Sequence, residues 1–574
     1  MKKTKSIILS FFLLLWATIA CKDDFLEVPP TGSLAQAQLS SEAGLEGSLI
    51  GTYSMLLGRG SGFYSSANNW FWGSVRGGDA NKGSDAGDQS QMNEVQAYDP
   101  QTTNSDVLNK YGRTYEGIAR ANSTLGLLAN ADEDVSDDTK LRIEAETKFL
   151  RGLYYFDLKR LYNNTPFIDE TWDAVEKIGN DKDLYPMIEA DIKFAADNLP
   201  ETQAEAGRIN KWAAMAYLAK VYLYQQKYAE AKALFDQVIA SGVTTNGKKY
   251  GLVPKFADIH RPANDNHEES VFAIQAAAGT GSINNANPDL VLNFTYNGGP
   301  AGCCGFFQPS FELSNSYRTN GGLPLLNGSY NDDANKLKHD LGIAADDDFT
   351  PDEGPVDPRL DHTVGRRGIP YLDWGNHPGK AWIRDQNNGG AYSPKKWVFY
   401  QEDQSAFTDG SSWTAGYTAI NVNLMRFADV LLMAAEVEVE IGDLEKAREY
   451  VNLVRERAAN AEGFVMTEEG DPAANYDIAL YTTAWTDQAT AREAVRFERK
   501  LELAMEGHRF FDLCRWGIAE DELNDYLSHE DAIIPASPFV GASFEGGVDE
   551  FLPIPQDEID LLGADVLKQN PGYN

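Results

Sequence analysis

The sequence predicts a mostly α-helical protein, built on a tetratricopeptide-like helical-repeat scaffold that carries a long irregular, loop-rich insertion. Residues 209–242 and 421–459 each contain two amphipathic stretches, with apolar residues recurring at spacings of three and four. Between them this periodicity disappears, and Gly, Pro, Asn and aromatic residues become frequent. We therefore expect helical repeats over about 105–242 and 421–517, and an insertion over about 243–420.

The two amphipathic segments follow the same plan. In the second, Gly442 suits the left-handed residue that ends a helix, and Asp443 suits the cap of the next helix. The alternative is two unrelated helical hairpins that share a generic heptad. The alignment of small with small and large with large residues favours a repeat: Ala219 with Ala435, Tyr228 with Leu444, Ala231 with Ala447, and Phe235 with Val451.

Helical periodicity also predicts helices at 108–125, 141–156, 184–199 and 492–516, and a weaker one at 41–57. Pro200 ends the third of these helices. Residues 58–100 are rich in Gly, Asn, Asp and Ser and predict an irregular loop. Within the insertion, residues 270–276 predict a short strand.

The balance of charge excludes one class of partner. The chain of 574 residues carries 86 acidic and 50 basic residues, for a net charge of −36. Such a chain repels phosphate backbones, so we expect no nucleic-acid partner. With 43% hydrophobic residues it can still form a large core.

The N-terminus predicts export. Three lysines precede the apolar segment 7–16, small residues follow, and Cys21 comes directly after Ala20. This pattern is typical of a secretory signal that is too short to span a membrane. We predict a lipoprotein signal peptide at 1–20, lipid attached to Cys21, a tether over 21–40, and one domain over 41–574.

Seven segments spread along the chain are informative together: CKDD (21–24), YGRTYEGIARAN (111–122), AETKFLRGLYYFDLKRLYN (145–163), DPRLDHTVGR (357–366), RFADVLLMAAE (426–436), ERKLELAMEGHRFFDLCRWG (498–517) and FLPIPQDEI (551–559). In order and spacing they resemble the SusD/RagB family of outer-membrane lipoproteins. Phe427, where the family usually has Tyr, is a modest departure. The resemblance implies four tetratricopeptide-like helix pairs, an outward-facing lipid anchor, non-catalytic glycan binding, and docking as a lid on a SusC-like TonB-dependent channel.

Aromatic residues in the predicted loops indicate a ligand site. Oligosaccharides are bound by aromatic rings under the flat sugar faces, and by amide, carboxylate and guanidinium groups at the hydroxyls. For any one loop tryptophan, the alternative is that it anchors its loop to the scaffold. The candidate residues form three groups: Trp70, Trp72, Arg76 and Asp79; Tyr296, Cys303, Cys304, Phe306 and Phe307; and Trp374, Trp382 and Arg384.

The adjacent cysteines form a separate hypothesis. Outside the cytoplasm, Cys303 and Cys304 can oxidise to a vicinal disulfide, and the flanking Gly302 and Gly305 permit the turn that it needs. Such a ring would present a rigid apolar face beside Phe306. The alternative, two separate thiols, stays open at this point.

The sequence contains no metal-binding or catalytic motif, so we expect no cofactor, no metal and no enzyme activity. Asp79, Asp85 and Asp88 could hold calcium, or could belong to a solvated turn. The acidic residues and His508 at 498–512 are close enough in sequence to suggest acid–base chemistry. Glu498 and Glu502, however, alternate with Arg499 in the manner of ion pairs within a helix, so this run predicts a charged face that holds the repeats together. Alternatives to glycan binding are binding of another nutrient such as peptide, a glycoside hydrolase with paired carboxylates, and a purely structural adaptor.

Overall fold

The structure, a computed structural model, describes residues 36–58, 64–172 and 174–573. The predicted signal peptide, the lipidated Cys21 and most of the tether lie outside these residues. Within the described ranges, no helix combines the length and the apolar character needed to cross a membrane. Buried apolar side chains from Leu45 to Leu567 form one continuous cluster, with a small second cluster around Phe256.

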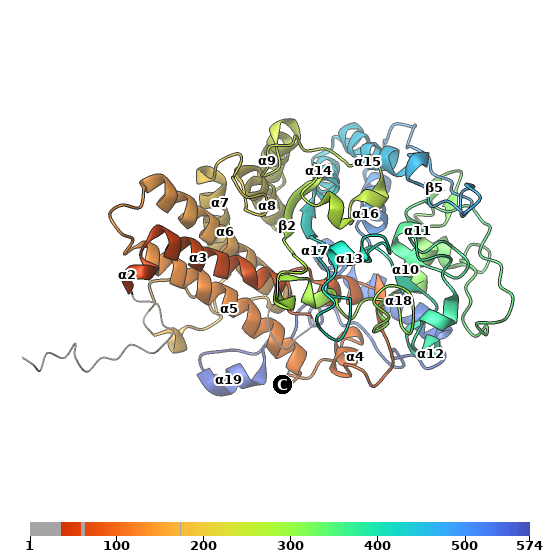
Figure 1. The fold of residues 1–574 in the computed structure, drawn as a ribbon, viewed down its shortest axis with the longest axis horizontal. Coiled ribbons are helices and arrows are strands. Elements are labelled where there is room, and N and C mark those ends of the chain that lie inside the picture. Colours follow the sequence, from red (N-terminus) through yellow and green to blue (C-terminus); the bar gives the residue numbers. More distant parts are fainter. Residues whose placement is uncertain (1–35, 59–63, 173, 574) are drawn as a thin grey trace, which may run out of the picture.

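Helix pairs build the N-terminal side of the molecule, at the left of Figure 1. Asn104 and Ser136 begin the two longest helices by accepting hydrogen bonds from backbone N–H groups of the first turn. Each helix packs against the next along the chain from α5 to α9, which confirms the predicted helices here. They are α2 (Gln36–Leu39), α3 (Glu42–Tyr53), α5 (Ser105–Leu128), α6 (Asp137–Tyr162), α7 (Tyr185–Asn198), α8 (Lys211–Tyr224) and α9 (Tyr228–Ser241).

The second hairpin consists of α14 (Phe427–Ile441) and α15 (Leu444–Ala458). Gly442 adopts a left-handed φ of +96°, and the Asp443 side chain accepts a hydrogen bond from the Lys446 backbone N–H, as predicted. Helix α14 packs against α9 and α8, so the two hairpins stack directly on one another. The tetratricopeptide-like arrangement of helix pairs is confirmed.

Two predicted helices differ from the structure. Residues 422–426 form strand β8 (Val422–Arg426), which pairs antiparallel with β2 (Ser270–Ile274), the strand predicted in the insertion. Residues 492–516 form two helices, α16 (Gln488–Glu502) and α17 (Arg509–Trp516). The break is required at Gly507, whose φ is +79° and where a Cβ atom would lie 2.2 Å from the Asn68 carbonyl oxygen.

The loop-rich part of the chain contains short elements, on the right and at the front of Figure 1. Strands β1 and β3 pair antiparallel, with Ala80 opposite Pro309 and Gly83 opposite Phe306, and so join residues 58–100 to the insertion. Here lie a π-helix at Trp70–Val75, β1 (Ala80–Gly83), α4 (Gln91–Gln96), β3 (Phe306–Pro309), α10 (Phe311–Ser316), β4 (Thr319–Asn320), β5 (Leu323–Pro324), α11 (Leu360–Thr363), β6 (Val364–Gly365), α12 (Gln386–Gly389), β7 (Ser393–Pro394) and α13 (Gln404–Phe407); α18 (Ala519–Ile533) and α19 (Gln556–Leu562) complete the chain.

A buried cluster of charges connects the insertion to the helices. Arg426, at the end of β8, lies 2.5 Å from Glu502 and 2.7 Å from both Glu269 and Glu506. Every member of this buried charge cluster is at most 6% exposed. Its five positive residues are Arg359, Lys396, Arg426, Arg455 and Arg457, and its five negative residues are Glu269, Asp357, Glu498, Glu502 and Glu506.

The prediction of a charged face that holds the repeats together is confirmed, but its ion pairs run between elements and not within one helix. Glu498 and Glu502 of α16 pair with Arg359 of the insertion at 2.6 Å and 3.0 Å, and Arg499 pairs with Asp429 of α14 at 2.8 Å. The sequence spacing fits a solvent-exposed helix face, but here the helix is buried on several sides. The charges consequently find their partners in other elements.

Removing one charge from this cluster should be costly. We expect Glu502→Gln to lower the free energy of unfolding by about 3–5 kcal/mol, because the buried guanidinium groups of Arg359, Arg426 and Arg457 each lose one counter-charge. The matched control is Asp197→Asn, in an ion pair whose side chains are more than half exposed, which should change the stability by less than about 0.5 kcal/mol. Urea denaturation measures both; equal effects would contradict the assigned role of the cluster.

The stability difference between wild type and Glu502→Gln should depend on pH. Burial by itself raises the pKa of Glu502, but the charges of Arg457, Arg426 and Arg359 outweigh it and hold the pKa far below its usual range. This stabilisation is complete above the pKa of unfolded glutamate, about 4.3, and decreases as the pH falls below it, by about 1.4 kcal/mol per pH unit. The stability difference between wild type and Glu502→Gln should therefore narrow between pH 5 and pH 3; a constant difference would contradict the shifted pKa.

Candidate functional site

The tryptophans of the first predicted group are buried. Trp70 is 1% exposed and Trp72 is fully buried, in the π-helix Trp70–Val75. The indole N–H of Trp72 donates to the Tyr64 carbonyl at 2.6 Å, and the ring of Trp70 packs on Phe307 at 5.1 Å between centroids. Rings without exposed surface cannot stack on a ligand. These two residues therefore do not contribute a sugar-binding surface.

The polar members of that group are also in the core. Arg76 donates to the Asp549 carbonyl at 2.7 Å, and its guanidinium carbon lies 4.0 Å from the centre of the Phe510 ring. The Asp79 carboxylate accepts from the Met505 backbone N–H at 2.8 Å. Burial raises the pKa of Asp79 to about 6. Both residues bind C-terminal segments to residues 70–79 and are not available to a ligand.

Two further predicted residues are structural. Phe306 and Phe307 begin strand β3 and are fully buried. They hold the chain that follows the two cysteines against β1. The expectation that they line a ligand surface is wrong, because consecutive residues of this strand face the core on both sides.

The cysteines lie in a compact loop, residues 293–305, which we term the cystine loop. Cys303 and Cys304 form a disulfide and are joined by a cis peptide bond. Cys303 is half-buried and Cys304 is 7% exposed. Gly302 and Gly305 have φ values of +67° and +77°, as the predicted turn requires. The disulfide hypothesis thus holds in the structure, and one edge of the cystine reaches the surface.

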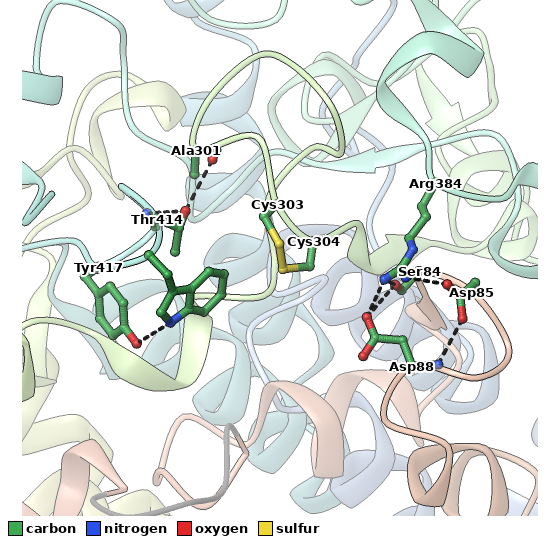
Figure 2. Close-up of a disulfide and its surroundings, with 11 residues drawn as sticks. Ser84, Asp85, Asp88, Ala301, Cys303, Cys304, Arg384, Thr414 and Tyr417 are labelled. Carbon is green, nitrogen blue, oxygen red and sulfur yellow. Dashed lines mark hydrogen bonds and ion pairs between the residues drawn. A yellow bond between two sulfur atoms is a disulfide. The ribbon is translucent and has the colours of Figure 1, made fainter. Parts of the chain in front are cut away.

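A polar cluster lies to one side of the cystine (Figure 2). Arg384 contacts Asp85 at 2.6 Å, Asp88 at 2.5 Å and the Ser84 hydroxyl at 2.9 Å. The Lys82 ammonium group donates to the Asp85 and Asp88 backbone carbonyls at 2.9 Å and 2.7 Å. Asp85 and Asp88 are thus ion-paired to Arg384, whereas Asp79 binds Met505, so the three aspartates do not share the calcium site considered above. The cluster combines two positive and two negative side chains.

The second and third predicted groups meet at the cystine loop. The guanidinium carbon of Arg384 lies 5.2 Å from the centre of the Tyr296 ring, and Tyr296 donates its backbone N–H to the Trp382 carbonyl at 2.8 Å. The Trp382 ring lies against Gly298 and Gly299, where an added Cβ atom would approach it to within 2.6 Å and 3.0 Å. Trp382 therefore supports the loop from beneath, which is the anchoring alternative for a loop tryptophan.

Thr414 and Tyr417 lie on the other side of the cystine in Figure 2, and their segment carries an exposed tryptophan that the three predicted groups do not include. Trp413 is 54% exposed, and its indole N–H donates to the Tyr417 hydroxyl at 3.2 Å. Thr414, next to it, donates to the Ala301 carbonyl of the cystine loop at 3.2 Å, so this segment is fixed to the loop (Figure 2). Trp413 is one of several tryptophans in the insertion, and its flanking sequence gives no sign of its exposure.

Trp374 anchors another loop. It is half-buried, and its indole N–H donates to the Phe399 carbonyl at 3.1 Å.

Of the predicted residues, the structure brings together Tyr296, Cys303, Cys304, Trp382 and Arg384. Sequence reasoning missed Trp413 as the exposed ring of this surface, and the buried Ser84 and Tyr417 as the partners that hold Arg384 and Trp413.

This surface, which we term the cystine surface, combines two kinds of contact. The Trp413 indole is exposed and the half-buried Cys303 brings one edge of the apolar cystine to the surface, whereas Arg384, Asp85 and Asp88 supply hydrogen-bond donors and acceptors. Both aspartates are already engaged by one arginine. The arrangement therefore suits binding of a ligand that has apolar faces and polar edges.

Comparison with known proteins adds family information. Residues 268–573 match a family model described as "SusD family", and residues 24–223 match one described as "Starch-binding associating with outer membrane". SusD-like protein P25 of Formosa agariphila is 26% identical over 553 residues, covering 91% of this chain and 92% of that protein. Starch-binding protein SusD of Bacteroides thetaiotaomicron is 32% identical over 151 residues, covering 25% of this chain and 26% of that protein.

Among solved structures, a laminarin-binding SusD-like protein superposes with a TM-score of 0.66 at 24% identity, covering 93% of this chain and 100% of that one. This likeness confirms the fold. The first family model alone spans more than half of the sequence, so the resemblance deduced from the seven segments is confirmed, and the chain belongs to the SusD family.

Proposed function

We propose that this protein is a non-catalytic glycan-binding lipoprotein of the outer membrane, and that the cystine surface holds the glycan. The observation that carries the proposal is an exposed indole, Trp413, on a segment that is hydrogen-bonded to the loop of the half-buried cystine, together with the polar cluster around Arg384. An indole and a cystine suit the apolar faces of a pyranose, and Arg384 and Asp88 suit its hydroxyls. The starch-binding relative and the laminarin-binding neighbour support a glycan over a peptide.

The proposal extends to partners and location. The description of the matched N-terminal family names association with the outer membrane. A leader that ends at Cys21 supports a lipid anchor on that residue, with the protein facing the cell exterior. In this proposal the bound oligosaccharide passes to a SusC-like TonB-dependent channel. Asp85 and Asp88 are both ion-paired to Arg384, which supports a ligand-binding function for this cluster.

Replacing Trp413 should abolish the stacking surface. We expect wild-type protein to be retarded by one or more of starch, laminarin and xylan in affinity electrophoresis, and Trp413→Ala to bind at least tenfold more weakly by calorimetry, a loss of about 1.4 kcal/mol or more. Trp172→Ala is the matched control, because Trp172 is similarly exposed, at 47%, between α6 and α7. Equal binding by both variants would exclude Trp413 from the site. Release of reducing sugar would overturn the non-catalytic assignment.

The cystine should be detectable chemically. We expect the proteolytic peptide that contains Cys303 and Cys304 to take up no iodoacetamide under denaturing, non-reducing conditions, and two labels after reduction. Reduction should also weaken glycan binding, because the loop that carries Tyr296 and contacts Arg384 loses the cross-link between its two adjacent cysteines and with it the apolar cystine face. Two labels without reductant would show free thiols, and unchanged affinity after reduction would remove the cystine from the binding surface.

A further inference from the structure

A cavity lies on the C-terminal helices, and none of its lining residues belongs to the cystine loop. It has a volume of about 430 Å³ and lies between α16, the segment from α17 to α18, and the loop around residues 326–331. This volume lies within the range of pockets that bind small molecules. Its walls combine charged side chains of both signs with the aromatic residues Tyr330, Phe497 and Trp516.

Two positively charged residues of the wall form ion pairs with carboxylates that also line the cavity. Lys500 lies 2.5 Å from the Glu312 carboxylate and donates to the Tyr330 hydroxyl at 3.1 Å. Arg509 lies 2.9 Å from Glu522. These groups fix the shape of the cavity and leave little unmet hydrogen-bonding capacity.

Glu493 and Arg496, one turn apart on α16, are not ion-paired as the other charged groups of the wall are. Among the residues that the structure describes, neither side chain has a hydrogen-bond partner or an ion-pair partner within 4 Å, although both are half-buried and line the cavity. The Nε atom of Arg496 is buried without an acceptor, and its guanidinium carbon lies 4.8 Å from the centre of the Trp516 ring. Burial lowers the pKa of Arg496, and burial together with the charge of Glu522 raises the pKa of Glu493. Both residues line the cavity without a partner side chain, so the Glu493 carboxylate and the outer guanidinium nitrogens of Arg496 can bind a ligand side by side.

From this juxtaposition we infer that the cavity is a second carbohydrate-binding site, for an uncharged sugar residue whose hydroxyls donate to Glu493 and accept from Arg496. A simple anion would meet Glu493, Glu522 and Asp525, and a simple cation would meet Arg496, Lys500 and Arg509. A neutral polyol supplies donors and acceptors together, without adding a charge that either set repels. The inference rests on the proposed glycan-binding function, but it uses none of the residues of the cystine surface.

Hydrogen–deuterium exchange can test this inference at peptide resolution. The probes are laminarihexaose, maltohexaose and xylohexaose, each added to the full chain at saturating concentration. We expect at least one probe to slow exchange both in the cystine loop and in the cavity loops at 325–331 and 516–520. Slowing at the cavity loops should persist in Trp413→Ala.

Arg496→Met should remove the slowing at the cavity loops and retain it at the cystine loop, because methionine keeps the apolar stem but lacks the donors. Arg492→Met, on the same helix, is the matched control: Arg492 pairs with Glu440 and does not line the cavity, so this variant should behave as wild type.

The outcomes separate this inference from the proposed function. Slowing at the cystine loop alone, or slowing at the cavity loops that survives Arg496→Met, overturns the second site and leaves the proposed function in place. Slowing at the cavity loops alone, lost in Arg496→Met, supports the second site and overturns the assignment of the cystine surface. Slowing at neither place with any probe overturns both.

Discussion

The structure depends on the buried charge cluster around Arg426 and Glu502. Charged groups removed from water are costly, and the cost is offset only when each is paired and hydrogen-bonded. Five positive and five negative side chains meet this condition together. His260 lies 3.7 Å from Glu506, but burial lowers its pKa to about 4, so at neutral pH it adds no charge. The cluster can form only when the insertion, β8 and α16 are all in place, so it couples their folding.

That coupling gives the ligand-binding loops a rigid support. Strand β3 leaves the cystine loop and pairs with β1, while Trp382 fills the space beneath Gly298 and Gly299. The helix pairs therefore do not bind the proposed ligand at the cystine surface. Contacts among the loops themselves bring together segments that are distant in sequence, such as those of Asp85, Cys303, Arg384 and Thr414 (Figure 2). Of the aromatic residues first considered for binding, most serve this supporting function, because a long loop needs large apolar side chains to fix it.

Local patterns determined what could be predicted from sequence. The helix pairs and the turn at Gly442 follow from periodicity and capping chemistry, which involve neighbouring residues only. The cystine follows from adjacent cysteines between glycines. Strand β8 was missed because its partner β2 lies about 150 residues earlier in the chain. Trp70 and Trp413 both read as loop tryptophans, and only the fold distinguishes the buried ring from the exposed one. Likewise the partners of Glu498 and Glu502 lie in elements whose proximity no local pattern reveals.

The polar cluster has equal numbers of positive and negative side chains, and this balance affects how a ligand reaches the surface. Arg384 and Lys82 offset Asp85 and Asp88, so the cluster projects little net field, and at physiological salt even that field fades within about 8 Å. A chain with a net charge of −36 thus presents a locally neutral patch beside the cystine. An uncharged oligosaccharide would reach it by diffusion and contact, without electrostatic steering. The rate of association at this surface would then be nearly independent of ionic strength.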